Sequence, residues 1–203
     1  MSRLRRFSSA LIVLAPLFLP GVALSYPPAV GITSPARNCL ACHADNGPWK
    51  EGDNLVIDIL DKATLKSLRQ PDGSFLISAK RGQPTIVLTV IGYRAADEQT
   101  VPYRNAWLYV DTTTIGNSSL TKFAPGWDVN LPLSCRLVGD KLEMFSDARI
   151  TSLPMILMAT AQARESVVML QVVLTKGEAV KGKAKEGMLG NYFERSVKLK
   201  VEE

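Results

Sequence analysis

The strongest constraint on the fold is a series of short segments rich in valine, isoleucine, leucine and aromatic residues. Such residues favour strands, because branched and aromatic side chains pack well on a pleated surface. Several segments also alternate apolar and polar residues, which is the period of a strand with one buried face. The predicted strands are Ser74 to Lys80, Thr85 to Tyr93, Asn105 to Asp111, Lys141 to Phe145, Ser166 to Leu174 and Val197 to Val201.

Turn signals separate these segments, and their spacing predicts the class of fold. Proline and glycine occur together at residues 70–73, 80–84 and 124–126, where they favour turns. Seven or so strands at this spacing predict an all-β protein, an antiparallel, immunoglobulin-like β-sandwich over residues 55–203. Residues 154–164 are ambiguous, because their methionine, leucine and alanine content also suits a helix.

The N-terminus has the pattern of an export signal. Arginines at positions 3, 5 and 6 precede an apolar run, and breaks at positions 16, 20 and 21 keep that run shorter than a membrane span. Ala23 and Ser25 are small residues at the positions that a signal peptidase reads. We therefore predict that residues 1–25 are a signal peptide for general secretion and that the mature chain begins at Tyr26 in the periplasm.

Charge and hydropathy argue against two kinds of partner. The full chain has a formal net charge of +5, but three arginines and no acidic residue lie in the predicted signal peptide, so the mature chain is nearly balanced. Such a balance gives no electrostatic reason to expect nucleic acid as a partner. No stretch after the signal peptide is long and apolar enough to predict a membrane span in the mature chain.

One short motif indicates the chemistry. Cys39-Leu40-Ala41-Cys42-His43 has the C-x-x-C-H pattern of covalent haem attachment. Two thiols at this spacing can each form a thioether to one vinyl group of a single porphyrin, and the next side chain then falls beneath the iron. The chain has three cysteines, and this odd number argues against a pure disulfide framework in an exported protein.

Three other roles for the motif are less well matched. A structural zinc site takes four ligands in two separated pairs, whereas Cys135 is the one further cysteine. A thioredoxin-like redox pair is expected where a strand runs into a helix, but residues 34–38 have the composition of a loop. A disulfide between Cys39 and Cys42 would close a small, strained ring.

The motif resembles the haem site of c-type cytochromes over these five residues. The resemblance implies one covalent haem c, with Cys39 and Cys42 as the attachment thiols and His43 as an axial iron ligand. Prolines at positions 27, 28 and 35 argue against the helix that precedes the motif in the small helical cytochromes. We expect residues 26–54 to be a haem-attachment segment of loops and a short helix in front of the sandwich.

The plan of the chain is also similar to that of cytochrome f. Both have a tyrosine at the mature N-terminus, a haem motif soon afterwards and a β-sandwich behind it. In that family the amino group of the tyrosine is the second axial ligand, and the resemblance would transfer this role to Tyr26. The whole chain, and its segment before the motif, are shorter than in cytochrome f.

A second histidine is not available as the sixth iron ligand, because the chain contains one histidine. Methionine would suit an electron carrier, because it raises the reduction potential. Met188 lies between two nearby glycines that free the backbone, and Met155 is the next candidate. The Tyr26 amine and the Cys135 thiolate remain alternatives, and the other methionines are expected to pack in the core.

These features predict an exported monohaem cytochrome that transfers electrons in the periplasm by Fe(III)/Fe(II) cycling and is not itself an enzyme. Its expected partners are redox proteins. Two alternatives are a haem-bearing subunit of a larger periplasmic oxidoreductase complex, which needs an apolar assembly surface, and a gas-binding or gas-sensing haem protein, which needs an open sixth position. A docking patch for an acidic partner, or else a solvated hairpin tip, is predicted at Lys176, Lys181, Lys183 and Lys185.

Overall fold

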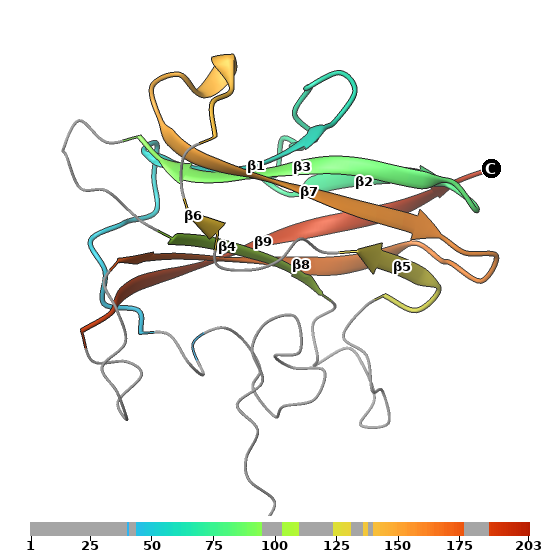
Figure 1. Cartoon of the computed structure of the whole chain (residues 1–203). Coiled ribbons are helices and arrows are strands. Elements are labelled where there is room, and N and C mark those ends of the chain that lie inside the picture. The colour runs from blue at the N-terminus through green and yellow to red at the C-terminus, as the bar shows by residue number, and fades with distance from the viewer. Residues whose placement is uncertain are drawn as a thin grey trace, which may run out of the picture.

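The computed structural model describes Leu40 and residues 44–94, 103–109, 124–130, 136–137, 140–176 and 187–203. These residues form two β-sheets stacked as a sandwich (Figure 1), which confirms the predicted all-β class. The first sheet has the strand order β1-β3-β7-β5, and the second has the order β2-β9-β8-β4-β6. The strands are β1 (Leu55–Asp61), β2 (Phe75–Lys80), β3 (Pro84–Tyr93), β4 (Tyr103–Tyr109), β5 (Trp127–Asn130), β6 (Arg136–Leu137), β7 (Arg149–Ala159), β8 (Ser166–Lys176) and β9 (Leu189–Glu202).

The first sheet turns one face of its apolar strands towards the core. β3 pairs antiparallel with both β1 and β7, and it places Ile91 opposite Ile57 and Val87 opposite Met155. Neighbouring side chains on a strand point to opposite faces. These four residues therefore share the inner face of the sheet, and all of them are buried in the main core.

β9 organises the second sheet. It pairs antiparallel with β8, from Leu189 opposite Lys176 to Leu199 opposite Ser166. Its other neighbour, β2, runs parallel to it and begins only at the pair Phe75 and Val197. The sheet is therefore mixed, which differs from the purely antiparallel sandwich that we predicted. A parallel pair requires a long connection, and here six of the strands that the structure describes lie between β2 and β9 in the sequence.

The main core fills the space between the two sheets. Ile59 and Leu157 of the first sheet and Phe75 and Leu170 of the second are fully buried in it. Burial of a side chain of this size stabilises a fold by roughly 1.5–3 kcal/mol. The core therefore joins β1 and β2 to β7 and β8, which lie much later in the sequence.

The segment Lys141 to Phe145, predicted as a strand, contains a short 3₁₀ helix (Glu143–Phe145) instead. Phe145 packs on a second, smaller cluster that lies on the outer face of the first sheet. A helical turn can lay one aromatic ring over a sheet without needing a hydrogen-bonding strand beside it. The buried members of this cluster are Val56, Leu60, Val90, Phe145 and Ile150.

The ambiguous residues 154–164 contain the end of β7 and a turn. Leu157 and Ala159 point into the core, while Pro154, Ile156 and Met158 lie on the outer face with more exposure. This alternation has the period of a strand, so the helical alternative is wrong. No helix in the described ranges is long and apolar enough to cross a membrane.

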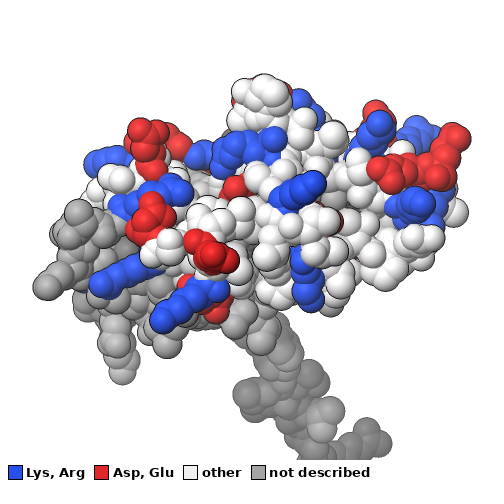
Figure 2. Space-filling model, turned by 90° about the horizontal axis from the view of Figure 1, so that it is seen from above, with Lys and Arg blue, Asp and Glu red and all other residues white. Residues whose placement is uncertain are grey.

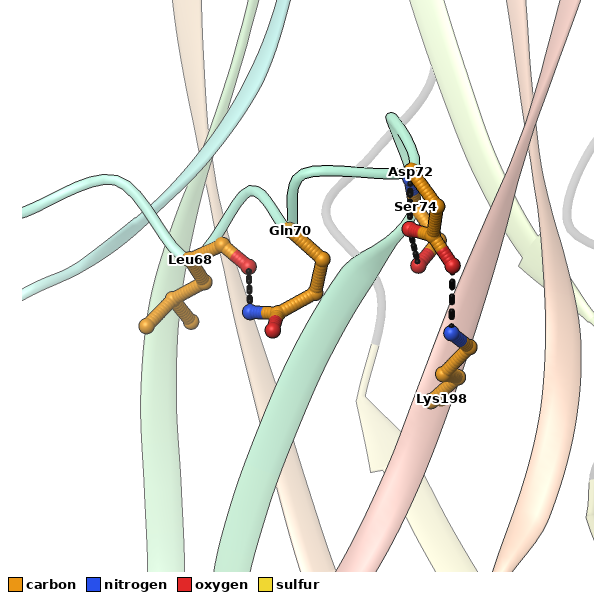
Figure 3. Close-up of polar contacts among 5 residues, drawn as sticks. All are labelled: Leu68, Gln70, Asp72, Ser74 and Lys198. Carbon is orange, nitrogen blue, oxygen red and sulfur yellow. Dashed lines mark hydrogen bonds and ion pairs between the residues drawn. The ribbon is translucent and has the colours of Figure 1, made fainter.

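A turn before β2 is held by an exposed carboxylate (Figure 3). Asp72 Oδ2 accepts a hydrogen bond from Lys198 Nζ of β9 at 2.7 Å, and Asp72 Oδ1 accepts one from the backbone N–H of Ser74 at 3.0 Å. The turn itself closes through Gly73, whose φ is +81° and whose N–H donates to the carbonyl of Gln70. The hydrogen bond from Lys198, together with those from Ser74, holds the pKa of Asp72 well below its ordinary value.

We expect the variant Asp72→Asn to unfold at a slightly lower denaturant concentration than the wild type at pH 7. A lowered pKa in the folded state stabilises the fold above the unfolded pKa of about 3.9, and this stabilisation is lost as the pH falls further. The difference between the two proteins should therefore narrow between pH 4 and pH 2 in urea titrations. Asp53→Asn, at an exposed carboxylate, is the control. A difference that is independent of pH would contradict this role for Asp72.

Candidate functional site

The predicted haem motif adjoins the described part of the sandwich. Cys39, Cys42 and His43 lie outside the described residues, as do the alternative ligands Tyr26 and Cys135. The described chain resumes at Ala44, the residue that follows His43. The structure therefore describes the segment that follows the motif and the surface to which this segment binds.

The first half of β9 has an open edge next to the motif. β2 pairs with β9 only from Val197 onward, so among the described strands none pairs with Gly190 and its neighbours on that side. The segment from Ala44 to Trp49, which we name the tether, occupies this edge. Gly47 donates its backbone N–H to the carbonyl of Gly190 at 2.7 Å, and Gly190 donates its own N–H to the side-chain oxygen of Asn46 at 3.2 Å. In Figure 1 the chain before β1 runs along one end of the sandwich, between the two layers.

A buried asparagine connects both ends of the tether to β9. Asn191 donates its side-chain N–H to Asp45 Oδ1 at 3.0 Å, and its side-chain oxygen accepts the backbone N–H of Trp49 at 2.9 Å. The same Asp45 oxygen accepts the backbone N–H of Tyr192 at 3.1 Å. Asn191 is 6% exposed, and leaving a buried polar group without its partners costs about 1–3 kcal/mol. These bonds therefore fix the position of the tether on the strand.

Two glycines allow the tether to lie close to β9. A Cβ atom on Gly190 would stand 2.7 Å from the carbonyl oxygen of Ala44. A Cβ atom on Gly47 would stand 2.5 Å from Asn191 Oδ1 and 2.8 Å from the ring of Trp49. All three distances are shorter than ordinary contacts, so glycine is required at these positions because of close packing.

Trp49 ends the tether inside the core. Its side chain is 3% exposed and belongs to the main core cluster, together with Phe193 of β9 and Leu55 of β1. Trp49 thus joins the segment before β1 to the sandwich. Residues assigned to the attachment segment therefore take part in the core of the sandwich.

The methionines differ sharply in their surroundings. Met188 is partly buried and lies immediately before β9, two residues before Gly190, against which Ala44 is closely packed. Met155 is fully buried in the main core, where the hydroxyl of Thr89 donates to its sulfur at 3.2 Å. Met144 is 50% exposed, so the expectation that it packs in the core is wrong. Met188 is thus a candidate ligand that adjoins the end of β9 to which the tether binds.

Sequence reasoning missed Asp45, Asn46 and Asn191. Asp45 and Asn191 are separated by 146 positions, and no local pattern marks either of them. The two glycines that flank Met188 were noticed for their freedom of backbone conformation, whereas Gly190 is required because Ala44 lies against it. Within the described residues, no group of three His, Cys, Asp or Glu side chains is arranged to hold a metal ion. No protein family model matches the sequence, and no curated protein matches it closely enough to indicate a family.

Proposed function

We propose that the protein is an exported monohaem c-type cytochrome that transfers electrons in the periplasm. Cys39 and Cys42 would attach the haem, and His43 would be one axial ligand, as their spacing indicates. The observation that carries the proposal is the direct connection of this motif to a tether that is bonded to β9 at several points. When bound, the haem supplies reversible one-electron transfer, and the protein sets its potential through the axial ligands and the burial of the group.

The tether explains how this chain would hold a haem without a helical bundle. Asp45 and Gly47 bond to β9, and Trp49 anchors the end of the segment in the core. A group attached at Cys42 and His43 would thereby be kept beside a rigid sheet. Such a fixed position favours electron transfer, because little structural change is needed when the charge of the iron changes.

We propose Met188 as the sixth ligand. It lies at the β9 end that contacts Ala44, whereas Met155 is enclosed in the core between the sheets and its sulfur accepts a hydrogen bond from Thr89. Using Met155 would require opening the main core. The Tyr26 amine and the Cys135 thiolate remain the alternatives if the sixth ligand is not a methionine.

The proposal is tested by expressing the protein with haem-maturation machinery and recording its oxidised and reduced absorption spectra. Haem that stays with the polypeptide after denaturation, together with c-type bands, is the expected result. Protein that folds and is exported without covalent haem would overturn the proposal. A weak far-red band in the oxidised spectrum reports a bond between methionine and iron.

The variant Met188→Ala is expected to lose the far-red band and to keep its covalent haem. The vacated position should let the ferrous form bind carbon monoxide without denaturation, and the reduction potential should fall, because methionine favours the ferrous state. Met144→Ala, at an exposed position on the 3₁₀ helix, is the matched control and should keep the band. If Met188→Ala retains the band, another methionine is the ligand. If the wild type itself binds carbon monoxide, a gas-binding role is favoured.

One surface supports the second candidate function, a haem-bearing subunit of a larger oxidoreductase complex. On the outer face of the first sheet, Ile86 pairs with Ile156 and Leu88 pairs with Pro154; Pro154 is exposed and the other three side chains are partly buried. Figure 2, which looks onto this side of the molecule, shows uncharged surface between scattered charges of both signs. Large contiguous patches of exposed apolar surface mark assembly surfaces, so this face is where we expect a permanent partner to bind. Purification of the native protein in a larger particle would favour the subunit role, and a monomer would favour the free carrier.

A further inference from the structure

A groove lies beside the middle of β9, and we name it the β9 groove. It has a volume of about 540 Å³ and is open to solvent, a size that suits a small molecule. Its lining includes Glu51, which follows the tether, Arg69 and Asp72, which precede β2, and Glu194 and Lys198 of β9. The contact between Asp72 and Lys198 is drawn in Figure 3. Charged side chains from three separate segments therefore meet around one cavity.

The groove lies where the edge of β9 is left without a neighbouring strand. Gly190 and Tyr192 direct their backbone N–H groups towards the tether. Backbone groups alternate between the two sides of a strand, so Glu194 and Ser196 direct theirs towards the same edge. β2 reaches this edge only at Val197. The four residues before it span about 13 Å, at roughly 3.3 Å per residue, so the gap between the tether and β2 suits a short ligand.

Two ion pairs account for four of the charges in the groove. Lys198 Nζ lies 2.7 Å from Asp72 Oδ2, and Arg195 pairs with Glu51. Within each pair the two charges offset one another. The remaining charges of the groove therefore determine which ligand it attracts.

Arg69 is the cation of the groove that has no acidic partner among the described residues. Its guanidinium carbon lies 4.8 Å from the centre of the Phe75 ring, and its Nη2 donates a hydrogen bond to the carbonyl of Ile57. Phe75 is fully buried, so these two contacts hold the guanidinium against a fixed ring. A guanidinium has five N–H donors in a planar fork that matches a carboxylate. Arg69 is therefore placed to bind a carboxylate.

Glu194 is the corresponding acid. Its Oε1 accepts hydrogen bonds from Gln171 Nε2 at 3.1 Å and from the hydroxyl of Tyr192. Both donors are neutral, and in the described part of the chain no ion pair involves the Glu194 carboxylate. Its negative charge is therefore available to a cationic group of a ligand.

We propose that the β9 groove binds a small zwitterion, a free amino acid or a short peptide, whose carboxylate contacts Arg69 and whose ammonium group contacts Glu194. A simple anion would gain from Arg69 but be repelled by Glu194, and a simple cation would meet the reverse. A ligand that carries both charges gains from both residues. The site does not depend on the haem that we propose for the Cys39–His43 motif.

Nuclear magnetic resonance titration of the intact protein with triglycine at low salt tests the proposal. The amide signals of Glu194 and Ser196 should shift and reach saturation, whereas that of Val90, on the other sheet, should not move. N-acetylglycine lacks the ammonium group and glycinamide lacks the carboxylate. Each should bind roughly tenfold more weakly than triglycine, because one charge-assisted contact is lost. Glycine distinguishes the two sources, since a free amino acid site binds it at least as tightly as triglycine and a peptide site binds it more weakly.

Two substitutions assign the contacts. Glu194→Gln keeps the size of an exposed side chain, and it should weaken triglycine roughly tenfold while leaving N-acetylglycine unchanged. Arg69→Gln should weaken triglycine and leave glycinamide unchanged. Lys200→Gln, at an exposed position of β9 outside the groove, is the control and should bind triglycine like the wild type.

Three results would overturn the proposal. The first is the absence of saturable shifts at Glu194 and Ser196 in the wild type. The second is binding of N-acetylglycine as tight as that of triglycine, which would indicate a site for simple anions. The third is unchanged triglycine affinity in the folded variant Glu194→Gln.

Discussion

Replacing both Cys39 and Cys42 with alanine is expected to abolish covalent haem completely. The two thiols are the atoms that would form the thioether bonds, so a denatured sample of this variant should show no haem on a gel and no increase in polypeptide mass. The fold should persist, because the bonds of Asp45, Gly47 and Trp49 to β9 do not involve the cysteines. Circular dichroism should therefore still report a β-rich protein.

The third cysteine is the matched control. Cys135→Ala is expected to keep its covalent haem, because a C-x-x-C-H site uses only the two thiols of the motif. A zinc site built from all three cysteines and His43 would behave differently, since loss of Cys135 would then weaken metal binding as well. Haem that remains attached after both Cys39 and Cys42 have been replaced would refute the assigned attachment.

Replacing Trp49 with alanine is expected to lower the free energy of unfolding by about 3–5 kcal/mol, the usual cost of removing a large aromatic side chain from a core. The side chain is 3% exposed and packs in the main cluster. Its loss should also loosen the tether, because the core contact of Trp49 holds the end of the segment that Asp45 and Gly47 bond to β9. Urea unfolding followed by far-ultraviolet circular dichroism measures the change.

Two substitutions calibrate this result. Trp49→Phe keeps an aromatic ring in the cavity and should cost clearly less than Trp49→Ala. Met144→Ala, at a 50% exposed position, should change the free energy of unfolding by no more than about 0.5 kcal/mol. If Trp49→Ala proved as stable as Met144→Ala, the tether would not be part of the cooperative fold.

The sequence predicted correctly those strands that are themselves rich in branched apolar residues. The segments predicted at residues 74–80, 85–93 and 166–174 correspond to β2, β3 and β8 within one or two residues. β9 begins at Leu189, well before the predicted start at Val197. The prediction missed the first half of this strand because glycine, asparagine and charged residues there break the apolar alternation. β5 has only four residues and was not predicted. The first half of β9 forms a strand because β8 supplies its hydrogen bonds, and β5 forms one because β7 does the same.

The sequence alone determined that the chain is mainly β and where its proposed chemistry lies, because strand alternation and the Cys39–His43 spacing are properties of neighbouring residues. Only the tertiary structure decided that β2 and β9 pair in parallel, that Trp49 belongs to the core and that Asp45 meets Asn191 across 146 positions. These contacts depend on which edges and faces the whole fold leaves unpaired. Strand β2 begins only at the pair Phe75 and Val197, and the tether binds to the edge of β9 that precedes this pair.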